Sequence, residues 1–133
     1  MKIKFWFAMA AVMMASAAVQ ASDESLRASY QRCMDRASTT ADMHDCSNTE
    51  MKYQDTRLNK AYQKAMKSLD QKRAQELQNL QRLWIRYRDA KCNFYNVPDG
   101  GSIVGLNVGG CLLTETTRRA DELEWITEEG SGF

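Results

Sequence analysis

No proline and no glycine occurs between residues 22 and 92, and this absence is the strongest constraint on the fold. These two residue types most often interrupt or end a helix, so a long stretch without them favours helical structure. One apolar helical face, with the spacing i, i+3, i+4, i+7 and i+11, is formed by Leu58, Ala61, Tyr62, Ala65 and Leu69. We therefore expect helices, and not strands, over this part of the chain.

Cap signals and apolar stripes predict about four helices. They are expected from Ser22 or Asp23 to about Asp35, from Thr40 or Asp42 to about Leu69, from the reset of the pattern around Asp70 to Cys92, and from Leu113 to about Thr127. Residues 93–110 differ, because they contain the only proline, Pro98, and five of the seven glycines. The sequence thus predicts an all-α fold, a small helical bundle with a glycine-rich loop of about 18 residues before the last helix.

The N-terminal residues have the three-part layout of a Sec signal peptide. The first four residues include two lysines, residues 5–15 are apolar, and residues 19–21 supply the small residues of a cleavage site. The apolar stretch is shorter than the ~20 residues that a membrane-spanning helix needs. We predict that residues 1–21 are a signal peptide cleaved after Ala21. Residues 22–133 are then one domain, periplasmic or secreted, with no stable membrane anchor.

The predicted mature chain is close to neutral. Removal of the leader leaves 16 basic side chains (18 less the two leader lysines) against 17 acidic ones, which gives no electrostatic attraction to nucleic acid or anionic lipid. The glycine pairs at 100–101 and 109–110 lack the preceding strand and the lysine of a phosphate-binding loop. No nucleophile is combined with a base and an orienting group, so we expect no enzyme and no cofactor.

The four cysteines all follow the predicted leader. An even number of cysteines in a small exported domain indicates disulfides, and four cysteines allow three pairings. We favour Cys33–Cys46 and Cys92–Cys111, because each pair brackets a segment rich in turn-forming residues. The alternative is a zinc site in which His44 joins Cys46 and Cys33, but no second paired-ligand motif accompanies it, and we expect no metal.

Two regions are candidates for binding a partner protein. Trp84 and Arg88 lie one helical turn apart, and they belong either to the core, with the arginine pairing a buried or half-buried acid, or to a binding hot spot. In the predicted loop, the candidate contact residues are Val97, Gly100, Gly101, Ser102, Ile103, Val104 and Leu106. Five acidic residues between positions 121 and 129 could in addition attract a basic partner.

Several motifs occur along the chain in the order known from one protein family. Residues 81–92 read Q-x-x-W-x-x-x-R-D-x-x-C, and residues 58–62 read L-N-x-x-Y. Together with the cysteine pair Cys33 and Cys46 and a closing segment at 116–123, these motifs resemble the LprI-type lysozyme-inhibitor domain, a family of secreted bacterial proteins. The resemblance covers nearly the whole predicted mature chain.

The resemblance implies a binding protein. Its expected partner is a lysozyme-like muramidase, which we expect to be inhibited by steric occlusion, with the loop at the enzyme's cleft. The alternative is a periplasmic adaptor or immunity-type protein that binds another envelope protein through the face of Trp84 and inhibits no lysozyme. Neither the partner's identity nor the oligomeric state follows from the sequence.

Overall fold

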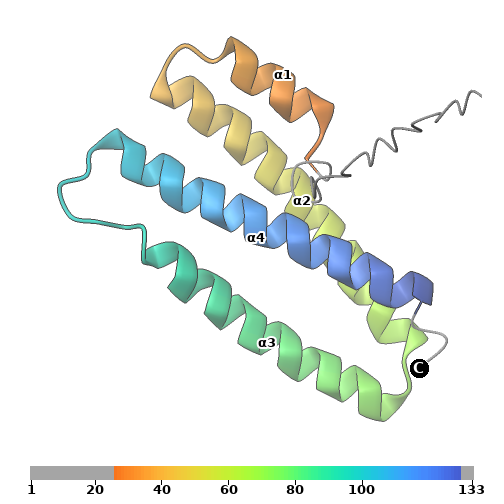
Figure 1. Cartoon of the computed structure of the whole chain (residues 1–133). Coiled ribbons are helices and arrows are strands. Elements are labelled where there is room, and N and C mark those ends of the chain that lie inside the picture. Colours follow the sequence, from red (N-terminus) through yellow and green to blue (C-terminus); the bar gives the residue numbers. More distant parts are fainter. Residues whose placement is uncertain (1–25, 130–133) are drawn as a thin grey trace, which may run out of the picture.

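The computed structural model describes residues 26–129, and four helices dominate that span (Figure 1). They are α1 (Ala28–Arg36), α2 (Thr40–Ser68), α3 (Gln71–Asn93) and α4 (Ser102–Glu129). Helices α2 and α4 pack most extensively on each other, α1 folds back along the first part of α2, and α3 runs antiparallel beside α4. The predicted all-α bundle of about four helices is confirmed. The predicted signal peptide, residues 1–21, lies outside the described residues.

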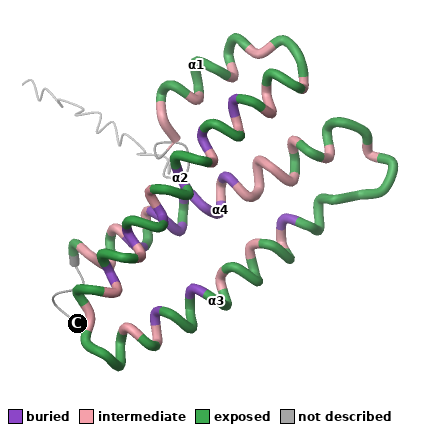
Figure 2. The backbone as a smooth tube through the Cα atoms, turned by 180° about the vertical axis from the view of Figure 1, so that it is seen from behind, coloured by how far each residue is buried: buried purple, intermediate pink, exposed green. Residues whose placement is uncertain are grey.

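The hydrophobic core is small and lies among α2, α3 and α4. It consists of Leu58, Ala61, Ala65, Leu77, Ala120 and Leu123, with Tyr62, Met66, Leu69, Trp84 and Ile126 packed against it. The apolar face predicted on the second helix therefore faces the core. Buried positions are sparse along α3 in Figure 2, and α1 has none. Helices α1 and α3 are thus peripheral, and other interactions must hold them to the central pair.

Helix starts follow the capping rules, although several differ from the predicted positions. The cap of α2 is Thr39 and not Thr40: its hydroxyl accepts from the Asp42 amide at 3.1 Å, while the Asp42 carboxylate accepts from the Thr39 amide at 2.9 Å. Helix α3 starts after Asp70, whose carboxylate accepts from the Arg73 amide. Helix α1 begins at Ala28, and Leu26 and Arg27 are not helical, so the prediction of a helix that continues from residue 22 or 23 was wrong at these two residues. Residues 22–25 lie outside the described residues.

The glycine-rich loop is shorter than predicted. The helix-free connection covers residues 94–101, and α4 begins at Ser102 instead of near Leu113. Glycine in a helix costs only about 1 kcal/mol relative to alanine, whereas proline costs about 3 kcal/mol, and no proline follows Pro98. The cross-link to α3 and the packing on α2 outweigh the cost of the three glycines, so the helix extends toward its N-terminus past Gly105 as far as Ser102.

Both favoured disulfides are confirmed. Cys33–Cys46 joins α1 to α2 with a Cα–Cα distance of 5.7 Å, and Cys92–Cys111 joins α3 to α4 with a distance of 5.4 Å. All four sulfurs are therefore bonded in pairs, which leaves no thiolate for the alternative zinc site. His44 is half-buried in the second turn of α2. Between residues 26 and 129, no helix combines the length and apolar character needed to cross a membrane.

Candidate protein-binding site

The connection between α3 and α4 forms a folded projection at one end of the bundle (Figure 1). Asp99 and Gly101 both adopt left-handed backbone angles, with φ of 63° and 66°, so the chain reverses sharply there. Gly100 is packed tightly: a Cβ at this position would lie 2.2 Å from Val104 Cγ2 and 3.0 Å from Val97 Cγ2. The connection thus packs against the first turn of α4, and its shape is set by its own contacts.

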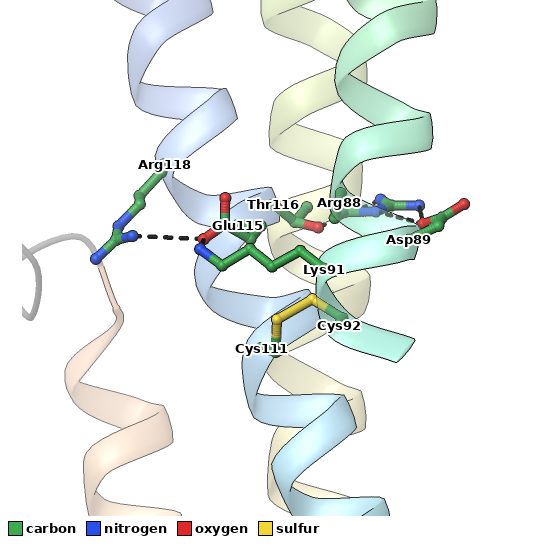
Figure 3. The surroundings of a disulfide bond; sticks show 8 residues. All are labelled: Arg88, Asp89, Lys91, Cys92, Cys111, Glu115, Thr116 and Arg118. Atoms are coloured by element: carbon green, nitrogen blue, oxygen red, sulfur yellow. Dashed lines mark hydrogen bonds and ion pairs between the residues drawn. A yellow bond between two sulfur atoms is a disulfide. The ribbon is translucent and has the colours of Figure 1, made fainter. Parts of the chain in front are cut away.

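The base of this projection is cross-linked twice (Figure 3). The disulfide Cys92–Cys111 ties the last turn of α3 to α4, and the Lys91 ammonium donates to the Glu115 carboxylate at 2.7 Å. Arg118 also pairs with Glu115, at 3.4 Å. The bond to Glu115 raises the pKa of Lys91, so the lysine stays charged. Covalent and ionic links together fix where the projection points.

Large apolar side chains are exposed on this projection. Phe94 is 82% exposed, Tyr95 45%, Val97 53% and Ile103 55%; these four residues are called the tip below. The rings of Phe94 and Tyr95 meet edge to face, with their centroids 6.0 Å apart. Clustered exposed apolar side chains are typical of protein-binding surfaces, where aromatic residues are enriched. The tip is therefore the candidate site.

The structure brings the loop candidates together. Val97 and Ile103 belong to the tip, Gly100 and Gly101 form its backbone turn, and Ser102 is the first residue of α4. Val104 and Leu106 are half-buried on α4. The sequence reasoning missed Phe94 and Tyr95, although both aromatic residues directly follow the motif that ends at Cys92. Their position just after the predicted end of a helix was the available signal that these side chains are exposed.

Trp84 and Arg88 lie apart from the tip, at the contact between α3 and α4. Trp84 is partly buried against the core, and the Arg88 guanidinium lies 5.0 Å from its ring centroid. Arg88 also pairs with Asp89 at 2.8 Å and reaches the Thr116 hydroxyl at 3.5 Å (Figure 3). The packing of Trp84 agrees with the core interpretation, but the acid that Arg88 pairs with is the exposed Asp89 and not the buried or half-buried acid expected. A role for this pair in binding stays a prediction.

The acidic end of α4 is largely paired within the molecule. Arg57 of α2 binds both Asp121 and Glu124, and these carboxylates raise its pKa. Arg119 pairs with Glu122 at 2.6 Å. The charge available to attract a basic partner is therefore smaller than the sequence suggested, because three of the acids are already opposite arginines.

Comparison with known proteins places the chain in a family. The family model described as Lysozyme inhibitor LprI matches residues 33–123. The uncharacterised protein R02472 of Rhizobium meliloti (strain 1021) is 30% identical over 107 residues, which cover 70% of this chain and 77% of that protein. No solved structure matches the chain significantly. The family match spans both disulfides and all of the helical core, and the chain therefore belongs to the lysozyme inhibitor LprI family.

Proposed function

We propose that this protein inhibits a lysozyme-type muramidase by placing the tip in the enzyme's substrate cleft. The observation that carries the proposal is the exposure of Phe94, at 82%, on a connection anchored by the Cys92–Cys111 disulfide. An enzyme that cleaves glycan chains holds its substrate in an open cleft between its catalytic carboxyl groups. A convex apolar projection that occupies this cleft excludes the glycan without any chemistry of its own.

Rigidity of the tip supports this mechanism. A loop that is ordered before binding loses less conformational entropy when it binds, so more of its contact energy appears as affinity. The packing of Gly100 against Val97 and Val104 and the Lys91–Glu115 ion pair supply that order. Two disulfides also suit the oxidising compartment in which an exported inhibitor would meet a muramidase.

The test is a turbidity assay of cell-wall lysis in which the oxidised protein is titrated against a panel of lysozyme types. The expected result is saturable inhibition of at least one lysozyme at about one-to-one stoichiometry. Phe94→Ser should weaken inhibition, whereas Leu80→Ser, which changes an exposed apolar residue on α3, should leave it unchanged. Absence of inhibition at large molar excess across the panel would rule the proposal out.

A second function, that of an adaptor or immunity-type protein, is favoured by one separate observation. The outward side of α3, away from the tip, also carries exposed apolar side chains, among them Leu80 and Leu83. Steric inhibition of a muramidase by the tip makes no use of them. Such a protein would bind a partner in the cell envelope without affecting lysozyme, and the two functions are distinguished by which surface the binding requires.

A further inference from the structure

Helix α3 is apolar on two sides. Its inner side buries Leu77 and Cys92. A second line with the spacing i, i+3, i+7 consists of Leu80, Leu83 and Tyr87, which are 55%, 54% and 56% exposed. This spacing is that of a helix face which packs on another helix. Among the described residues no element covers this line, so the face resembles one half of a helix–helix contact.

Two arginines lie beside this line. Arg82 and Arg86 are both exposed and are spaced i, i+4, so their like charges repel along the helix. The one acidic residue within a turn of either is Asp89, and it pairs with Arg88 at 2.8 Å. Within residues 26–129, neither Arg82 nor Arg86 has an ion pair. Like charges at adjacent turns destabilise the helix, and within the described structure no ion pair of these two arginines offsets that cost.

Both arginines line a surface hollow together with Leu83, the one residue of the apolar line that lies in it. A shallow depression on α3 is lined by Asn79, Arg82, Leu83, Ile85 and Arg86. Arginine presents a planar set of donors that matches a carboxylate through two parallel hydrogen bonds. The hollow therefore offers apolar contact and two carboxylate-binding groups within two helical turns.

We propose that the outer face of α3, defined as Leu80, Arg82, Leu83, Arg86 and Tyr87, docks an amphipathic helix of a different protein, with apolar residues bordered by carboxylates. The positive charge of the two arginines favours a partner that carries carboxylates. A second copy of the same face would bring arginine toward arginine across a two-fold axis. An anionic membrane is less suitable, because stable attachment by charge takes clusters of four or more basic residues and this face has two.

The test uses two synthetic helical peptides that share a leucine stripe and differ in the flanking residues, glutamate in one and lysine in the other. Fluorescence anisotropy should show that the glutamate peptide binds the oxidised protein more tightly than the lysine peptide. The double variant Arg82→Glu/Arg86→Glu should bind the glutamate peptide about tenfold or more weakly than wild type does, and it should prefer the lysine peptide. The double variant Leu83→Ser/Tyr87→Ser should bind both peptides more weakly than wild type does.

A matched control is available on α2. Lys60→Glu/Lys64→Glu makes the same change of charge at exposed positions with the same i, i+4 spacing, and it should leave peptide binding unchanged. The proposal is overturned if neither peptide binds, or if the α2 variant acts like the α3 variant. It is also overturned if sedimentation reveals a dimer that Leu83→Ser dissociates, or if vesicles of phosphatidylglycerol and phosphatidylethanolamine bind the face while the peptides do not. Inhibition of lysozyme tests the tip and is independent of these results.

Discussion

At the scale of single residues, Glu50 shows how the protein accommodates a buried charge. Its side chain, 1% exposed, accepts hydrogen bonds from the Arg27 guanidinium at 2.8 Å and from the Gln54 amide at 2.8 Å. A buried carboxylate without such partners is strongly unfavourable. Arg27 also lies 3.9 Å from the centroid of the Tyr53 ring. Because α1 buries no residue of its own, these contacts supplement the disulfide in holding it to α2.

Loss of Arg27 should therefore destabilise the fold. Arg27→Ala leaves Glu50 buried with one partner fewer, and we expect a loss of about 1–3 kcal/mol in the free energy of unfolding. Urea denaturation followed by circular dichroism measures it. The control is Arg32→Ala, an exposed arginine on α1 whose side chain has no hydrogen bond among the described residues; it should change stability by less than about 0.5 kcal/mol. Equal losses in both variants would contradict this account of Glu50.

Asp42 should make stability depend on acid pH. Hydrogen bonds from Thr39 and Ser38 hold its pKa below the usual 3.8. The folded pKa is lower than the unfolded one, so the stabilisation is present above the unfolded value and is lost as the pH falls through the folded pKa. The difference in unfolding free energy between wild type and Asp42→Asn should thus be largest near neutral pH. It should disappear as the pH falls below about 3.8. A difference that stays constant down to low pH would contradict the capping role.

At the scale of elements, α4 shows where sequence reasoning succeeded and where it failed. The helix after Cys111 was predicted from its apolar spacing, but the turns before it were assigned to a loop because they contain Gly105, Gly109 and Gly110. The structure supplies what the pattern lacked. A Cβ on Gly105 would lie 2.9 Å from Cε1 of His44, so this glycine marks a close contact between α4 and α2. Contacts between distant residues of this kind leave no local signal in the sequence.

Two glycines of α4 should respond differently to the same substitution. Nothing lies within 4 Å of a Cβ placed on Gly109, so Gly109→Ala should raise stability by about 0.5–1 kcal/mol through helix propensity. Gly105→Ala gains the same propensity but displaces His44, so it should be less stable than Gly109→Ala. Thermal unfolding measures both. Adding His44→Ala to the Gly105→Ala variant should remove the steric clash and so restore stability. If Gly105→Ala is as stable as Gly109→Ala, the contact with His44 does not contribute to stability.

The two disulfides differ in accessibility, and their reduction should follow that difference. Cys33 is exposed and its partner Cys46 is 4% exposed, whereas Cys92 is 1% exposed and its partner Cys111 is half-buried. Thiol–disulfide exchange requires access to a sulfur atom. Under limiting dithiothreitol, alkylation and mass spectrometry should find Cys33 and Cys46 labelled before Cys92 and Cys111. Labelling in the opposite order would contradict the exposures described here.

At the scale of the whole molecule, a small core is supplemented by cross-links at one end of each peripheral helix. The Cys92–Cys111 link spans 19 residues and is worth about 3 kcal/mol in the loop-closure model, a large part of the 5–15 kcal/mol typical of a domain. The helices and both pairings could be predicted, because spacing and turn residues are local signals. The tip could be predicted only in part: Phe94 is prominent because α3 ends just before it and no other part of the described chain folds over it.

The central claim is that the tip makes the contact with a muramidase. Isothermal titration calorimetry of an inhibited lysozyme with the double variants Phe94→Ala/Ile103→Ala and Leu80→Ala/Leu83→Ala tests it, since each removes two apolar side chains that are more than half exposed. The account predicts that the tip variant binds at least about tenfold more weakly and that the α3 variant binds like wild type. Wild-type affinity in the tip variant, or a loss confined to the α3 variant, would contradict it.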